Sequence, residues 1–183
     1  MNTARRGRRQ LLGLACFVFC PDLLWAQGSD DADESHVKAA FLYKFTSYVD
    51  WPDSAFGNAD APFVIGVMGS DTMLETLLQL TAGRKVHERA VVVKKVQAGE
   101  PMLGNLHVLF VGRPDALRAE ITRPVLTVTE ADGGMPAGSM INFLVVDRHV
   151  RFEIELPSVE KAGLKMSSRL LAVAQKVYRS KER

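Results

Sequence analysis

Two short fragments of the sequence have residue types and spacings that occur in catalytic sites. Ser158 and Lys161 have the Ser-x-x-Lys spacing of penicillin-recognising enzymes, but the Ser-Asp-Asn and Lys-Thr-Gly elements which that chemistry also needs are not in the sequence. His87 and Glu88 begin a zincin-type motif, but Val91 stands where the second zinc-binding histidine is required. Since no nucleophile can be paired with a base from spacing, the sequence predicts no catalytic residue and a protein that is not an enzyme. Ser158 is interpreted as the cap of a helical turn.

One stretch has the composition of a ligand-binding turn. Gly69, Ser70 and Asp71 follow an apolar run at residues 63–68 and precede an apolar helical pattern, and the backbone amides of such a turn can hold an anion. The stretch lacks the lysine of a phosphate-binding loop and the three-glycine dinucleotide fingerprint. These three residues are the candidate ligand-binding residues, with plain turn chemistry as the alternative.

The histidines do not form a metal-binding pattern. They occupy positions 36, 87, 107 and 149, and the spacing pairs none of them with a second ligand. No metal and no cofactor is therefore predicted. His107 opens an apolar run and is interpreted as a hydrogen-bonded residue at the edge of the core.

The N-terminal residues 1–26 have the organisation of a signal peptide. A cluster of arginines precedes an apolar run at residues 11–19, which is too short to span a bilayer, and the small residue Ala26 follows as a cleavage site. We therefore expect export and cleavage, by the general or the twin-arginine route. A retained anchor and a lipoprotein, modified at Cys16 or Cys20, are the less favoured alternatives.

Removal of this segment changes what composition implies. The formal net charge of +2 depends on the arginines of the signal peptide, so the remaining chain is slightly acidic and no nucleic-acid partner is expected. Both cysteines lie in the removed segment, which excludes disulfides, thiolate zinc sites and thiol redox sensing in the mature domain. A hydrophobic content of 47% suits one globular domain at residues 35–183, preceded by a flexible leader at residues 27–34.

Apolar periodicity predicts an α/β fold with a mainly parallel sheet flanked by helices. A helix is expected over residues 35–49, with its core stripe formed by Val37, Ala40, Phe41, Phe45 and Tyr48. Continuous apolar runs at residues 63–68, 90–93, 106–111 and 125–129 predict strands covered on both faces. A short helix is expected over residues 113–121, and the strand order stays open.

The C-terminal third predicts a β-hairpin and a long closing helix. Residues 139–146 and 149–156 are joined by two residues, and the second strand alternates between apolar and polar positions. A helical turn is expected at residues 157–161 and the closing helix at residues 162–179. The core stripe of the closing helix is Met166, Leu170, Val173 and Val177. Its basic face is Lys161, Lys165, Arg169, Lys176 and Arg179.

Three blocks of sequence together resemble one protein family. They are VKAAFLYKF at residues 37–45, with Trp51-Pro52 after it, VIGVMG at residues 64–69, and VRFEI at residues 150–154 followed by AGLKMSSRLL at residues 162–171. In order and spacing these blocks resemble the YfiR-type proteins of the bacterial periplasm, over residues 35–178. The sequence departs from the family in lacking mature cysteine pairs and in carrying Glu155 where the family has asparagine.

The resemblance implies a periplasmic α/β domain without catalysis of its own. It would hold an inner-membrane diguanylate cyclase inactive through the periplasmic sensor domain of that enzyme, and so control cyclic di-GMP and biofilm formation. The partner surface is predicted on the wet face of the last hairpin strand and the first turns of the closing helix. Its residues are His149, Arg151, Glu153, Lys165, Ser168 and Arg169.

A second interpretation is a small-molecule-binding module of a membrane signalling system. Its ligand would lie at the carboxyl ends of the strands, where open α/β sheets bind ligands. The two interpretations can coexist, because a ligand can set partner affinity by binding one state better. The sequence leaves open whether the protein forms a homodimer.

Overall fold

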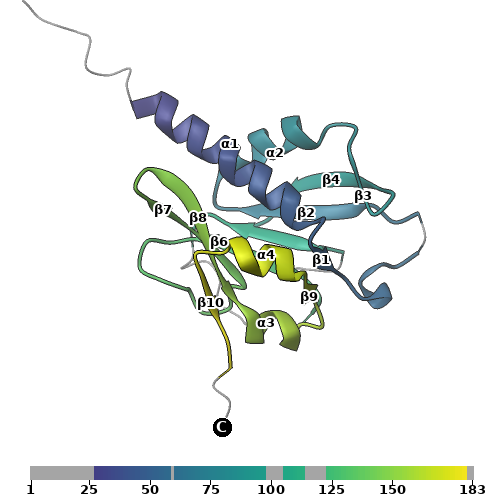
Figure 1. Ribbon diagram of the computed structural model, residues 1–183. Coiled ribbons are helices and arrows are strands. Elements are labelled where there is room, and N and C mark those ends of the chain that lie inside the picture. Colours follow the sequence, from purple (N-terminus) through teal and green to yellow (C-terminus); the bar gives the residue numbers. More distant parts are fainter. Residues whose placement is uncertain (1–26, 59, 98–104, 114–122, 181–183) are drawn as a thin grey trace, which may run out of the picture.

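The computed structural model describes residues 27–58, 60–97, 105–113 and 123–180. It is a mixed α/β fold, which confirms the predicted class. An eight-stranded sheet has the order β10-β8-β7-β6-β5-β2-β4-β3 (Figure 1). Its strands are β2 (Phe63–Met68), β3 (Lys85–Val86), β4 (Arg89–Lys95), β5 (Val108–Val111), β6 (Leu126–Glu130), β7 (Ile141–Val146), β8 (His149–Glu155) and β10 (Lys176–Tyr178).

The sheet contains both parallel and antiparallel pairs. Strand β2 pairs in parallel with β4 and β5, and the parallel pairing continues through β6 to β7. Strands β7 and β8 pair antiparallel, as do β3 and β4, whereas β10 runs parallel to β8. A separate two-stranded sheet joins β1 (Val49–Asp50) to β9 (Lys165–Met166).

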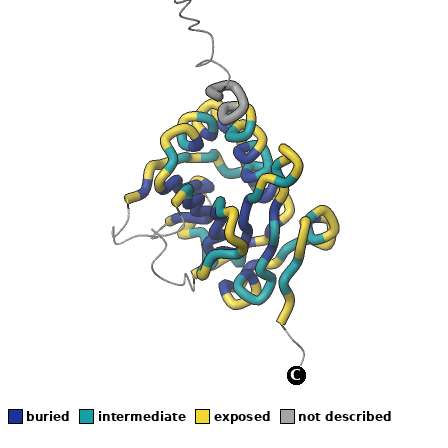
Figure 2. Tube along the Cα trace, turned by 90° about the vertical axis from the view of Figure 1, so that its left-hand side faces the viewer, coloured by how far each residue is buried: buried dark blue, intermediate teal, exposed yellow. Residues whose placement is uncertain are grey.

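Helices α1 (Gln27–Phe45) and α2 (Asp71–Thr81) pack on one face of the eight-stranded sheet. Alternate residues of β2 divide between the two faces: Phe63 and Ile65 join the large core under the helices, while Val64 and Met68 join a smaller cluster behind. The C-terminal part adds α3 (Leu156–Lys161) and α4 (Ser168–Val173), and a 3₁₀ turn lies at Asp53–Ala55. Buried residues follow the central strands, with exposed residues on the outer sides of the helices and turns (Figure 2).

Helix α1 differs from its prediction in position and in rotation. It already begins at Gln27, so the leader expected to be flexible is helical. It ends at Phe45, because the chain turns there and Val49 pairs with Met166 of β9. The predicted core stripe is wrong in part: Val37 is 43% exposed and Tyr48 39%. The residues that face the sheet are Lys38, Ala39, Leu42, Phe45 and, beyond the helix, Thr46 and Val49.

The strands lie where they are predicted, but the burial of β4 differs from the prediction that both of its faces are covered. Strands β2 and β5 are buried at every residue, as expected for strands covered on both faces. Strand β4 alternates instead, with Val92 exposed. It lies near the end of the sheet, and β3 pairs only with Arg89 and Ala90. The helix expected at residues 113–121 falls almost wholly outside the described residues.

The prediction of a long closing helix is wrong. Residues 162–179 form β9, α4 and β10 instead of one helix. Gly163 has φ +75°, a left-handed conformation that ends α3, and Ser167 caps α4 by accepting a hydrogen bond from the Leu170 amide. The chain then pairs with β8, with Lys176 opposite Glu153. Backbone pairing in the sheet thus prevails over the local helical pattern, and β10, not the hairpin, forms the end of the sheet.

Candidate partner-binding surface

A cluster of aromatic rings fixes α1 to strands β7 and β8. The ring of Phe45 lies 5.0 Å from that of Phe152 and 5.7 Å from that of Phe143, measured between centroids. Phe41 adds an edge contact with Phe152 at 5.7 Å. Phe45, Phe143 and Phe152 are buried; Phe152 meets Phe41 and Phe45 edge-on, whereas Phe45 and Phe143 are stacked, and aromatic pairs favour both arrangements. The helix and the two strands are therefore held together as one rigid surface.

Two adjoining hollows lie along the outer side of this cluster and share Phe41 as a wall. The first, of about 610 Å³, lies between α1 and the turn that joins β7 to β8. The second, of about 320 Å³, lies between α1 and α4. We call the two together the α1 groove. Its lining residues are Asp33, Glu34, Val37, Phe41, Lys44, Phe45, Tyr48, Val145, Arg148, His149, Val150, Arg151, Phe152, Arg169, Leu170 and Val173.

Exposed apolar side chains gather in the α1 groove. Val37, Tyr48, Val145 and Val173 all line it, with exposed fractions of 43%, 39%, 42% and 67%. Only two other large apolar residues in the described part of the chain are comparably exposed, Leu78 and Val92. Single exposed apolar residues are ordinary on a protein surface, whereas here four of them line two adjoining hollows.

Four cations border the same groove. They are Lys44, Arg148, Arg151 and Arg169, and none of them has an ion-pair partner among the described residues. Arg148 projects from a two-residue turn in which Asp147 and Arg148 have φ of 50° and 59°, the conformation that suits a tight hairpin. The groove thus combines an apolar floor with a mainly basic rim.

The structure brings together half of the predicted partner residues. His149, Arg151 and Arg169 line the α1 groove. The other three lie outside its lining: Glu153 accepts a hydrogen bond from Tyr178 at 3.1 Å, Lys165 lies in β9, and Ser168 begins α4.

Sequence reasoning missed the apolar floor of the groove. Val37 and Tyr48 repeat at the helical spacing of a core stripe, as does Val173 in the pattern of the closing helix, but all three are exposed; Phe41 packs against the core as predicted. The available signal was an excess of apolar positions: Ala39 and Leu42 lie beside the predicted stripe, and one helix face cannot bury both sets.

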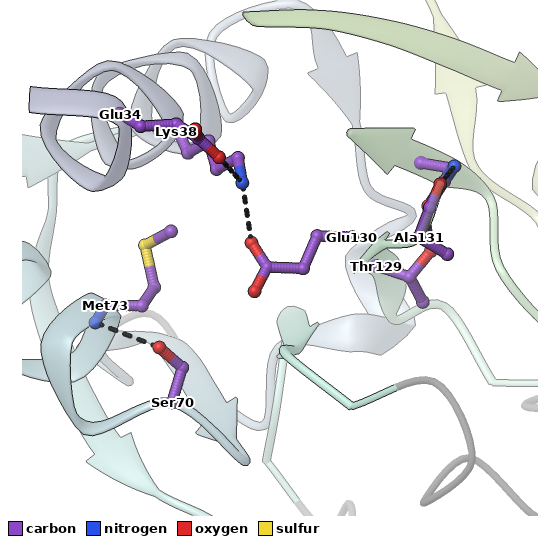
Figure 3. A network of polar contacts seen from close by, with 8 residues as sticks. Glu34, Lys38, Ser70, Met73, Thr129, Glu130 and Ala131 are labelled. Carbon is purple, nitrogen blue, oxygen red and sulfur yellow. Dashed lines mark hydrogen bonds and ion pairs between the residues drawn. The ribbon is translucent and has the colours of Figure 1, made fainter. Parts of the chain in front are cut away.

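Ion pairs between the buried Lys38 and two half-buried carboxylates anchor α1 above the carboxyl end of β6. The ammonium of Lys38 lies between the carboxylates of Glu34 and Glu130, and its Nζ donates to Glu130 Oε2 at 2.9 Å (Figure 3). Lys38 is only 8% exposed. Burial alone would lower the pKa of Lys38, but the hydrogen bonds and charges of the two carboxylates outweigh it and raise the pKa. Sequence reasoning missed this contact, since Lys38 and Glu130 are distant in the chain.

A second polar network holds the chain next to Glu130. The hydroxyl of Thr129 lies 2.8 Å from the hydroxyl of Ser139 and donates to the side-chain oxygen of Asn142 at 2.8 Å. The Asn142 amide in turn donates to the carbonyl of Ala131 at 2.9 Å. All three side chains are buried, and each has a partner, as buried polar groups require.

The predicted ligand-binding turn is built as expected, and its polar groups are already engaged. The Ser70 hydroxyl accepts from the Met73 amide at 3.2 Å and so caps α2 (Figure 3). The Asp71 carboxylate accepts from Lys95 at 2.5 Å. Gly69 has φ +78°, and a Cβ at Gly112 would lie 2.9 Å from that of Ser70. The side chains of Ser70 and Asp71 therefore have partners within the fold, and the turn packs closely against Gly112.

His107 is a buried structural residue, which agrees with its interpretation. Its Nδ1 accepts from the Val64 amide at 3.0 Å, and its ring stacks between Phe56 and Phe63 at 4.6 and 4.8 Å. Its backbone carbonyl accepts from the indole of Trp51 at 3.0 Å. Burial lowers the pKa of His107 to about 4, so the ring is neutral at physiological pH.

Among the described residues, no helix combines the length and the hydropathy that crossing a membrane requires.

A sequence model of the family described as YfiR/HmsC-like matches residues 35–175. The match covers most of α1, both strands of the hairpin and all of α4, which are the elements that form the α1 groove.

Proposed function

Because the chain belongs to the YfiR/HmsC-like family, we propose that it is a periplasmic regulator without catalysis of its own. It binds the periplasmic sensor domain of an inner-membrane diguanylate cyclase and represses that enzyme, and so lowers cyclic di-GMP and biofilm formation. Residues 1–26 direct export and are then removed.

The observation that carries this proposal is the α1 groove. A regulator that acts by binding needs a fixed surface with exposed apolar side chains, and the aromatic cluster around Phe45 fixes this one. Val37 of α1 and Val145 of β7 both line the first hollow and provide the apolar contact. Of the residues predicted from sequence, His149, Arg151 and Arg169 contact the partner from the rim, and Glu153, Lys165 and Ser168 flank it.

Repression follows if the regulator binds the inactive sensor more tightly than the active one. A ligand shifts a two-state equilibrium only by its differential affinity, and a hundredfold preference corresponds to about 2.7 kcal/mol. Electrostatic attraction from the cations on the rim speeds association, while the apolar floor slows dissociation.

The experiment is a reconstitution with the cyclase. Membranes that contain the full-length cyclase are given GTP, and cyclic di-GMP synthesis is measured with and without the purified protein on the periplasmic side. We expect synthesis to fall in a saturable way as the protein is added. Unchanged synthesis, with the protein folded and in excess, would exclude repression.

The alternative small-molecule module has weaker support. The turn at Gly69, Ser70 and Asp71 would hold an anion through its backbone amides, while the side chains of Ser70 and Asp71 are engaged by the Met73 amide and by Lys95. A thermal-shift screen over nucleotides, amino acids and sugars tests it, since a ligand at 100 times its dissociation constant adds about 2.7 kcal/mol of stability.

A further inference from the structure

The charges and apolar side chains of the α1 groove define the chemistry of what it binds. We propose that the groove takes a short acidic segment that carries large apolar side chains, supplied by the partner protein. This inference rests on the proposed function for the identity of the partner, and on the groove alone for the chemistry of the segment.

The length of the groove comes from α1. Asp33, Val37, Phe41 and Lys44 follow one another along one side of the helix, and Tyr48 continues the line beyond its end. At 1.5 Å per residue, the helical part of this line is about 17 Å long. The groove therefore accommodates about three helical turns of a bound segment.

The charges favour an acidic occupant. Arg148 and Arg151 border the hollow near the hairpin turn, while Lys44 and Arg169 border the hollow near α4, so cations lie at both ends. Two acids, Asp33 and Glu34, also line the first hollow. Glu34 is engaged by Lys38, so Asp33 is the acid that remains beside the cations. Unpaired cations around a partly desolvated site favour carboxylates on the partner.

The same charges disfavour a second copy of this chain. A symmetric contact through the groove would bring two basic rims together, and like charges brought close at an interface are costly. A lipid surface is also a poorer fit, because the apolar floor is concave and lies between α1, the hairpin turn and α4.

Three labelled peptides of about three helical turns test the chemistry directly. The first combines glutamate with leucine and phenylalanine, the second replaces each glutamate with lysine, and the third keeps glutamate but replaces the apolar residues with serine. Binding to the full chain is followed by fluorescence anisotropy at low and high salt. We expect the first peptide to bind at least about tenfold more tightly than either control, with binding weakened by salt.

Matched variants locate the binding. The double variant Arg151→Glu/Arg169→Glu should weaken binding of the first peptide at least about tenfold. Lys94→Glu/Arg179→Glu changes the same total charge at exposed residues outside the groove and should bind like the parent. Melting temperatures of both variants show that they are folded. Equal binding by all three proteins, or preference for the lysine peptide, would overturn the inference.

A second measurement separates this inference from the proposed function. If the sensor domain binds the protein but the first peptide neither binds nor competes, the inference is wrong and the proposed function stands. If the peptide binds in the groove but the protein does not repress the cyclase, the inference stands and the proposed function fails. Groove-dependent binding to anionic vesicles or groove-dependent dimers, without peptide binding, would also overturn the inference.

Discussion

Lys38 of α1 donates a hydrogen bond of 2.9 Å to the carboxylate of Glu130 at the end of β6, although 92 residues separate them in the sequence. This contact ties the helix that forms one wall of the groove to the centre of the sheet. A buried ammonium is costly unless it is paired, so the two carboxylates around Lys38 determine the stability of this contact.

We expect Glu130→Gln to destabilise the fold by about 1–3 kcal/mol, because it leaves the buried Lys38 with one carboxylate. The double variant Lys38→Met/Glu130→Gln should recover part of the loss, since it removes the buried charge together with its partner. Urea unfolding of the parent and the two variants measures this. A single variant as stable as the parent would show that the pair contributes nothing.

Stability should depend on pH through His107. Burial, aided by the charge of Arg89, lowers the pKa of His107 to about 4 in the folded state, whereas an unfolded histidine titrates near 6.5. The unfolded chain therefore binds the proton first as pH falls, and stability is lost from about pH 6.5 down to about pH 4, by at most about 1.4 kcal/mol per unit.

The control for this pH dependence is His107→Gln, which cannot titrate. It should be less stable than the parent at pH 7, because the ring stack with Phe56 and Phe63 is lost. Its stability should, however, change less between pH 6.5 and pH 4. Parallel pH profiles for the two proteins would show that another group is responsible.

Gly163→Ala distinguishes the observed C-terminal structure from a continuous helix by the sign of its effect. At φ +75° an alanine is strained, and we expect a loss of about 1–2 kcal/mol, although a Cβ there meets nothing within 4 Å. In the interior of a helix the same change would add about 1 kcal/mol of stability. Thermal unfolding of the two proteins decides between these outcomes.

Reductant should leave the exported protein unchanged. If cleavage after Ala26 removes Cys16 and Cys20, the mature protein has no thiol, and dithiothreitol should not shift its melting temperature or its binding to the sensor domain. Intact mass of the periplasmic protein checks the cleavage site independently. A reductant-dependent melting temperature would show that the cysteines are retained.

Local patterns in the sequence predicted the elements whose structure is decided locally. The apolar run at residues 63–68 predicted β2 at the right position, and the helical pattern expected after Asp71 is α2, because strand burial and helical periodicity depend on neighbouring residues. His107 was also placed correctly, since a polar residue beside a buried strand needs a hydrogen-bond partner.

The predictions were wrong where contacts between residues distant in the sequence determine the secondary structure or the burial. The pattern of residues 162–179 fits a helix, but pairing of β10 with β8 and of β9 with β1 fixes another structure. The periodicity of α1 contains two apolar stripes, and only the position of the sheet decides that Leu42 is buried and Val37 is exposed. Three of the six predicted partner residues line the groove: the alternation of β8 places His149 and Arg151 there, and Arg169 comes from α4. The excess of apolar positions on α1 was visible in the sequence, but only the fold shows which of them are exposed.

Binding of the sensor domain of a diguanylate cyclase by the α1 groove is tested by titrating that domain with three proteins. The parent is compared with Val37→Asp/Val145→Asp, in the groove, and with Leu78→Asp/Val92→Asp, where the exposed fractions of 47% and 42% match those of the first pair. All three should be folded, since exposed substitutions change stability by about 0.5 kcal/mol or less. We predict that the groove variant loses at least about tenfold in affinity, while the control variant binds like the parent. Equal affinity of the groove variant and the parent would contradict binding through the groove.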